Sequence, residues 1–179
     1  MTSRDEPPRE LFLAGGKVHE ALFTPSAMLA LRASLEMTQK THWDSVRSPH
    51  LFMGLLEISD EPITRWAIAL DADLPKLLRQ FLGLFHQESG EKNALVRLHR
   101  EFFSDNLIRV LREAIGRAQS HGREQVTSLD LLISVLTTSN SVVAECFDRI
   151  GIPSHRLTEK AMRTEQGDAN EGSFPEISD

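Results

Sequence analysis

Cysteine is nearly absent from this chain of 179 residues, which excludes one way of holding a fold together. The single cysteine, Cys146, cannot form an internal disulfide, and this fits a reducing compartment. No apolar run approaches the ~20 residues of a membrane-spanning helix. No signal peptide is recognisable, because the apolar stretch at residues 11–14 is too short. We therefore expect a cytoplasmic protein without a membrane partner.

Excess charge is missing from the central part of the chain. The net charge is −6, but residues 164–179 hold five acidic residues and no Lys or Arg, and residues 1–10 carry −1. The remaining residues are neutral, so the acidity belongs to the ends and does not indicate the partners of the folded part. Apolar residues make up 40% of the chain, which is enough for a packed core.

A strong basic face is also missing. Residues 97–123 contain six Arg against three acidic residues, a net charge of +3. A nucleic-acid-binding surface usually carries more positive charge than this. We interpret the stretch as a solvated helix face and expect no nucleic-acid partner.

The residue patterns of a catalytic or metal centre are absent. None of the seven His is spaced three or four residues from another His or from Cys on a clear helix, so no metal site is predicted. No nucleophile-elbow pattern occurs. The sequence around Gly15-Gly16-Lys17 lacks a phosphate loop, because Leu11 and Val18 occupy the positions of its first Gly and its Ser or Thr. Cys146 falls on an apolar helix face and is interpreted as a core residue. We expect no enzyme activity, cofactor or metal.

What the chain does contain is a repeat. Residues 23–77 recur as residues 103–157 at a constant offset of 80, without a gap. Paired positions keep their residue or their apolar character; identical pairs include Phe23/Phe103, Leu51/Leu131, Leu56/Leu136 and Leu77/Leu157. Two copies are too few for a solenoid. They predict one compact domain with a pseudo-twofold axis.

Helix-start signals divide each repeat into one long and three shorter helices. Thr24-Pro25 supplies an N-cap and a first helical residue, and apolar residues follow at helical spacing to about Lys40. Similar signals predict helices from about residues 48, 60 and 73, and then from about 104, 128, 140 and 154, the last ending near Arg163.

The chain is therefore predicted to be all-α, with eight helices. We place an N-terminal extension at residues 1–22, repeat one at 23–86, a linker at 87–102 and repeat two at 103–163. Residues 164–179 are expected to form an acidic, disordered tail.

Several stretches of the two repeats carry a resemblance to a known module. They are residues 23–25 with the long helix after them, 48–56, 70–77, and their partners 128–136 and 150–157. In this order and at this period they resemble the Clp N-terminal domain, the double-repeat helical module found before the ATPase rings of Clp-type unfoldases and disaggregases. The resemblance covers about residues 20–163.

Two departures limit what the resemblance implies. Many members have Glu before the His-Leu of the second helix, and in the protease-linked branch these Glu bind phosphoarginine. Here Pro49 and Leu129 stand at those positions, and a guanidinium-binding site needs its carboxylates. The ATPase ring is missing as well, since the 22 residues after Leu157 cannot form a nucleotide-binding domain. The chain is either a free-standing protein or the excised N-terminal domain of an unfoldase, and its acidic tail favours the first.

The resemblance also implies where partners bind. Similar domains use a shallow apolar groove where the start of the long helix meets the second helix. The corresponding residues are Thr24, Met28 and Pro49 in repeat one, and Ser104, Leu107, Arg123, Leu129 and Asp130 in repeat two. Leu129 either packs on the other repeat or forms a groove floor with Arg123 at its rim. Trp43 lies in a polar loop and either packs on the edge of its repeat or is an exposed partner anchor.

Together these features imply a non-enzymatic adaptor or recognition factor for a Clp-type chaperone or protease. It would bind a protein or peptide client through an apolar groove. The alternative is a structural accessory subunit that docks on an assembled Clp protease or type VI secretion complex. Two pairs differ between the repeats, Pro49 against Leu129 and Trp43 against Arg123. These differences indicate that one repeat binds and the other supports it.

Overall fold

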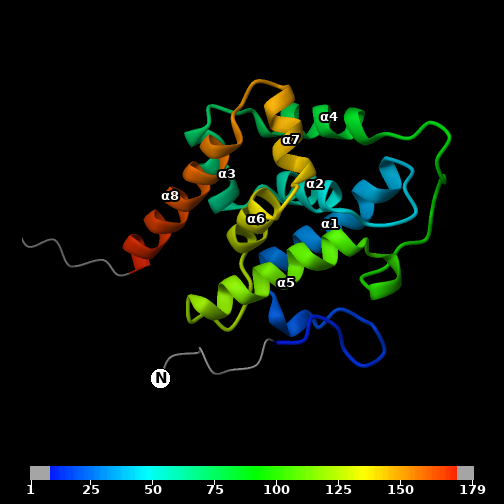
Figure 1. Cartoon of the computed structure of the whole chain (residues 1–179), viewed down its shortest axis with the longest axis horizontal. Coiled ribbons are helices and arrows are strands. Elements are labelled where there is room, and N and C mark those ends of the chain that lie inside the picture. Colours follow the sequence, from blue (N-terminus) through cyan, green and yellow to red (C-terminus); the bar gives the residue numbers. More distant parts are fainter. Residues whose placement is uncertain (1–8, 173–179) are drawn as a thin grey trace, which may run out of the picture.

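The structure, a computed structural model, describes the backbone of residues 9–172 and the side chains of residues 9–167 (Figure 1). Within this part the chain forms eight α-helices and no strand beyond isolated bridges, which confirms the predicted all-α class. Repeat one contains α1 (Pro25–Lys40), α2 (Ser48–Ile58), α3 (Glu61–Ala69) and α4 (Leu74–Phe85). Repeat two contains α5 (Asp105–Ser120), α6 (Ser128–Thr137), α7 (Val142–Arg149) and α8 (Ser154–Gly172).

Local capping explains why the helix starts could be read from the sequence. The hydroxyl of Thr24 accepts a hydrogen bond from the N–H of Ala27, and the hydroxyl of Ser104 accepts one from Leu107 at the equivalent place in repeat two. Each bond satisfies an N–H group that the helix itself leaves without a partner. The helix that we predicted from about residue 140 is α7, and its cap is Ser141.

The described segments on either side of the two repeats are more structured than we expected. Leu11 and Val18, assigned to an N-terminal extension, are each 1% exposed and belong to the core. The N–H of Val18 donates to the carbonyl of Leu98, so this segment packs on the linker. At the other end α8 continues past Arg163 to Gly172, through residues that we had placed in a disordered tail. Residues 1–8 and 173–179 lie outside the described part.

The centre of the molecule is a cluster of four aromatic rings from both repeats. Phe52 of α2 lies 4.8 Å from Phe81, 5.5 Å from Phe147 and 6.2 Å from Trp66, measured between ring centroids. The indole N–H of Trp66 donates to the carbonyl of Leu157 in α8 over 3.1 Å, so this buried donor is satisfied. The cluster joins α2, α3 and α4 to α7 and fixes the two repeats as one unit.

The two long helices pack differently against their second helices. In repeat one, a Cβ added to Gly54 of α2 would lie 2.4 Å from the backbone oxygen of Ala30 in α1. Only glycine allows this close approach of the two backbones. The equivalent residue in repeat two is Ser134, which has a side chain. The pair α1 and α2 therefore depends on a glycine, and the pair α5 and α6 does not.

Candidate functional site

Two short cross-repeat contacts decide which helix starts lie together. Phe23 pairs with Val126, and Val46 pairs with Phe103, each as an isolated parallel bridge. The N–H of Thr24 donates to the carbonyl of Val126, and the N–H of Ser104 donates to the carbonyl of Val46, both over 3.0 Å. The start of each long helix thus lies beside the start of the second helix of the other repeat. Both junctions cross between the repeats, whereas we had expected a groove within each one.

Site one is a hollow of about 440 Å³ at one of these junctions. Its wall combines the loop before α2, the end of α4, the start of α5 and the turn before α7. The lining residues are Trp43, Arg47, Ser48, Pro49, His50, Phe85, Ser104, Asn106, Arg109, Ser139, Asn140 and Val142. Site one thus brings together three of the predicted residues, namely Trp43, Pro49 and Ser104.

Trp43 is the centre of site one, and its position is fixed by three contacts. Its indole N–H donates to the carbonyl of Phe85 over 2.6 Å. The guanidinium carbon of Arg47 lies 4.7 Å from its ring centroid, within the range of a cation–π contact. The ring of His50 meets it edge-on at 5.7 Å. Trp43 is half-buried, so the structure combines both interpretations of this residue: it packs on its repeat, and part of the ring remains accessible.

His50 forms the neutral floor of site one. Its Nδ1 accepts a hydrogen bond from the N–H of Arg47 over 3.0 Å, so the proton lies on Nε2, which donates to the hydroxyl of Thr41. Burial lowers the pKa of His50 to about 4, and the positive charge of Arg47 acts in the same direction. The imidazole is therefore uncharged at neutral pH, and it caps α2 from the third helical position.

Site two is the counterpart of site one at the other junction. It is a hollow of about 660 Å³ lined by Pro62, His121, Arg123, Thr127, Ser128, Leu129, Glu165 and Gln166. At the offset of 80, these lining residues match site one at six positions: Val142/Pro62, Trp43/Arg123, Arg47/Thr127, Ser48/Ser128, Pro49/Leu129 and Phe85/Glu165. The predicted residues Arg123 and Leu129 thus lie in site two, away from Pro49.

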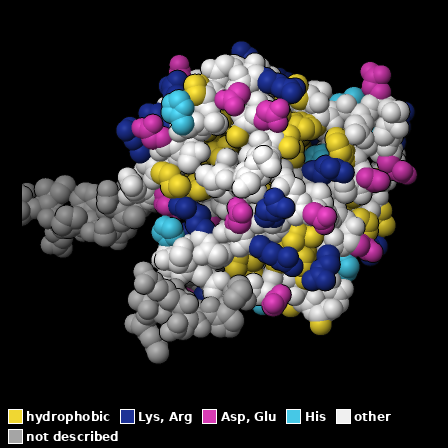
Figure 2. Space-filling view, in the orientation of Figure 1, with side chains coloured by type: hydrophobic (Ala, Val, Ile, Leu, Met, Phe, Trp, Pro, Cys, Tyr) yellow, Lys and Arg dark blue, Asp and Glu magenta, His cyan; other side chains and the backbone are white. Residues whose placement is uncertain are grey.

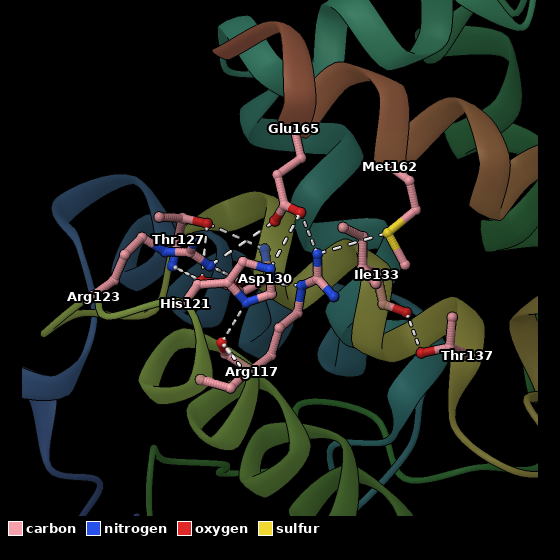
Figure 3. Close-up of polar contacts among 10 residues, drawn as sticks. Arg117, His121, Arg123, Thr127, Asp130, Ile133, Thr137, Met162 and Glu165 are labelled. Carbon is pink, nitrogen blue, oxygen red and sulfur yellow. Dashed lines mark hydrogen bonds and ion pairs between the residues drawn. The ribbon is translucent and has the colours of Figure 1, made fainter. Parts of the chain in front are cut away.

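An ionic cluster occupies the edge of site two (Figure 3). The carboxylate of Asp130, which is fully buried, pairs with the guanidinium of Arg123 and lies 3.3 Å from Nε of Arg117. Glu165 of α8 pairs with Arg117 and lies 3.9 Å from Arg123. His121 lies 3.9 Å from the same carboxylate. The cluster therefore ties α8 to α5 and to the start of α6.

Three of the predicted residues have buried apolar side chains, namely Met28, Leu107 and Leu129. Met28 is 6% exposed and Leu107 is 1% exposed, and both belong to the core. Leu129 is 4% exposed, which favours the packed interpretation of this residue, although its edge lines site two. Thr24 is half-buried and caps α1.

Sequence reasoning missed several residues of site one. Arg47, Asn106, Arg109 and Phe85 were not predicted, although they line the hollow together with Trp43. Arg47 follows Trp43 by four residues and directly precedes the helix-start Ser48-Pro49, which was a usable signal. Phe85 and Arg109 come from other elements, and nothing in the local sequence places them beside this loop.

The remaining titratable groups give no sign of a chemical centre within the described residues. No group of three or more His, Cys, Asp or Glu there is arranged to hold a metal ion. Burial raises the pKa of the Cys146 thiol, which packs against the core as predicted. As to the membrane, no single described helix is long and apolar enough to cross one. Taken together, α6 and α7 are long and apolar enough, but the two helices are bent by 74° at their junction.

Comparison with solved structures identifies the fold. The N-terminal domain of the caseinolytic protease associated chaperone ClpD from Arabidopsis thaliana superimposes with a TM-score of 0.58 and 16% identity, covering 81% of this chain and 95% of that one. The Hsp104 N-terminal domain from Candida albicans gives a TM-score of 0.63 and 12% identity, covering 78% and 89%. This chain has the fold of a Clp N-terminal domain. The N-domain of ClpV from Vibrio cholerae is also similar, with a TM-score of 0.59, 15% identity, and coverage of 80% and 85%.

These likenesses establish the Clp N-terminal fold and no more, because all three identities are low. No protein-family model matches the chain, and a comparison with curated proteins finds no match.

Proposed function

We propose that the chain is a non-enzymatic adaptor or recognition factor that binds a protein or peptide segment in site one. It would deliver this segment to a Clp-type chaperone or protease in the cytoplasm. The observation that carries the proposal is the construction of site one. An accessible tryptophan is held in place at a surface hollow, beside Phe85 and beside Val142, which is 37% exposed.

This construction suits peptide binding for two physical reasons. Tryptophan and arginine are the residues that most often dominate binding energy at protein interfaces, and Trp43 and Arg47 stand together here. The hydrogen bond from Trp43 to Phe85 fixes the ring before a ligand arrives, so less side-chain freedom is lost on binding. The Clp N-terminal fold adds support, since one of the similar structures is the N-terminal domain of a chaperone associated with a caseinolytic protease.

A selection from a library of random 12-residue peptides tests the proposal without a guess about the ligand. Peptides are selected on the full chain, and their affinities are then measured for the wild type, Trp43→Ala and Val142→Trp. The first variant removes the anchor, and the second obstructs the hollow from an exposed position. Gln166→Ala, an exposed change in site two, is the matched control.

We expect peptides that lose about tenfold or more in affinity with both site-one variants and keep it with the control. A selection that yields no peptide above background would contradict the proposal. Binding to an assembled Clp ring in that situation would favour the accessory-subunit role. Peptides that respond only to Gln166→Ala would move the binding surface to site two.

A further inference from the structure

The positive charge of site one has no counterpart of opposite sign in the hollow. Arg47 and Arg109 both line it and are both exposed, whereas no Asp or Glu lines it. Among the described residues, no carboxylate forms an ion pair with either guanidinium. Arg109 also borders a neighbouring hollow of about 630 Å³, whose lining includes Arg100 and Arg112 with Asp105 and Glu113. That neighbouring hollow is mixed in charge, with three arginines against two carboxylates, so the excess of positive charge without a carboxylate is confined to site one.

Site two shows what the same place in the fold contains when the chain supplies its own carboxylates. Asp130 and Glu165 neutralise the arginines there, and Asp60 accepts hydrogen bonds from the hydroxyl of Ser128 and from the N–H of Ile63. At the offset of 80, the equivalent residues are His50 for Asp130, Phe85 for Glu165 and Asn140 for Asp60, and all three line site one. His50 is uncharged because burial lowers its pKa. Three carboxylates of site two are thus replaced by three neutral groups in site one.

The helix starts add to this electrostatic difference. Ser48 and Pro49 of α2, Asn106 of α5 and Val142 of α7 line site one, and the start of a helix carries partial positive charge. In site two Asp60 caps α3, and the carboxylate of Asp130 accepts a hydrogen bond from the N–H of Thr127 at the start of α6. At site one the equivalent residues are the neutral Asn140 and His50; Asp105 in the first turn of α5 and Glu145 in that of α7 do not line the hollow.

We propose that site one selects acidic peptide segments that carry an aromatic or large aliphatic side chain. The inference rests on the proposed function and names the chemistry of its ligand. Carboxylates of the ligand would pair with Arg47 and Arg109. These ion pairs would replace the ones that site two makes with its own carboxylates. The apolar side chain would pack against Trp43, Phe85 and Val142.

The face of the molecule in Figure 2 is mixed: Lys, Arg, Asp and Glu side chains lie between patches of hydrophobic side chains. An uncharged apolar segment would fill the hollow but leave the two guanidinium groups without a partner. A highly charged ligand without an apolar group, such as a nucleic-acid backbone, would use the arginines but leave the rings uncovered.

The composition of the peptides selected from the random library tests this inference. We expect Asp and Glu to be enriched together with an aromatic or large aliphatic residue. The affinity of such peptides is then compared between the wild type and the double variant Arg47→Glu/Arg109→Glu. The matched control is Arg79→Glu/Arg156→Glu, which has the same net charge and changes two exposed arginines that do not line site one.

The expected result is a loss of about tenfold or more for the site-one double variant and less than about twofold for the control. Binding should also weaken as NaCl is raised from about 0.05 to 0.5 M, because exposed ion pairs are screened. Selected peptides without acidic enrichment, or peptides that bind the double variant equally well, would overturn the inference and leave the proposed function standing. The absence of any binder would overturn both. Tighter binding of a random single-stranded RNA, lost in the double variant, would overturn it in favour of nucleic acid.

Discussion

Site one and site two lie at the two equivalent junctions between the repeats, but they are built from different chemistry. Site one is organised by neutral contacts: Trp43 bonds to the backbone at Phe85, and His50 is held uncharged between Arg47 and Thr41. Site two is organised by ion pairs among two arginines and two carboxylates, one of which comes from α8. The comparison shows that the fold tolerates either solution at a junction between helix starts.

The difference also separates stability from binding. In site two the charges satisfy one another, so the cluster holds α5, α6 and α8 together and leaves little charge for a partner. In site one the fixed groups are neutral, and the exposed guanidinium groups are left for a ligand. We infer that site two stabilises the molecule at its junction and that site one supplies the binding surface. Each of the following changes tests one side of this comparison.

The largest effect is expected at the buried carboxylate of site two. Asp130→Asn keeps the size of the side chain but leaves Arg117 and Arg123 with an uncharged partner, and breaking a buried ion pair of this kind costs about 3–5 kcal/mol. Urea unfolding measures the loss. The control is Glu145→Gln, which removes an exposed pair with Arg149 and should cost less than about 0.5 kcal/mol. Equal, small losses would show that the ionic cluster does not stabilise repeat two.

The close packing of repeat one is the next most sensitive feature. Gly54→Ala forces a Cβ against the backbone of Ala30, and we expect a loss of about 2–3 kcal/mol because overpacking a rigid contact displaces the helices. Ser134→Ala changes the equivalent position of repeat two and should cost less than about 1 kcal/mol. Thermal or urea unfolding compares the two. A tolerated Gly54→Ala would mean that α1 can move away from α2.

The pH dependence of the free energy of unfolding distinguishes the neutral His50 of site one from the ionic cluster of site two. The pKa of His50 is about 4 in the folded protein and near 6.5 when unfolded, so the unfolded state binds the proton more tightly. The stability that the neutral His50 contributes to the folded protein is therefore complete above pH 6.5 and is lost as the pH falls towards 4. Between pH 7 and pH 5 it should amount to about 2 kcal/mol.

The variant His50→Gln isolates this effect, because its side chain does not titrate. Urea unfolding at the two pH values should show a smaller loss for His50→Gln than for the wild type, by about 2 kcal/mol. Parallel losses in the two proteins would mean that His50 is not held neutral by burial.

The smallest change in free energy is expected for binding. Trp43→Ala should weaken a selected peptide by about tenfold, or ~1.4 kcal/mol, because it removes the aromatic surface and the partner of Arg47. Gln166→Ala in site two should change affinity by less than about twofold. Fluorescence anisotropy with a labelled peptide measures both. A larger effect of the site-two change would reverse the roles that we assign to the two sites.

The sequence predicted the helices well because their starts depend on local groups. The caps Thr24 and Ser104 act on residues three positions away, so a single stretch contains the whole signal. The offset of 80 also identified which positions are equivalent. It could not show that the start of α1 pairs with repeat two, because an internal repeat does not specify which elements touch.

The parts that were missed depend on contacts between distant residues. Glu165 lies in a stretch with no basic residue, which indicated a solvated tail, but it pairs with Arg117 across the structure. Leu11 and Val18 follow a polar start, and their burial depends on the linker. The candidate site was predicted in part for the same reason: Trp43 and Pro49 are recognisable locally, while Phe85 and Arg109 reach them only through the fold.

One spectrum tests the central claim that site one is the binding surface. The chain contains two tryptophans, so a ¹H–¹⁵N spectrum has two indole signals: one from Trp43 in site one and one from Trp66 in the aromatic core. Trp43→Phe assigns them. On addition of a selected peptide, the Trp43 indole signal should move while the Trp66 signal stays in place. A bound peptide that leaves the Trp43 signal unchanged, and instead shifts the backbone signals of His121 and Gln166 in site two, would contradict the account.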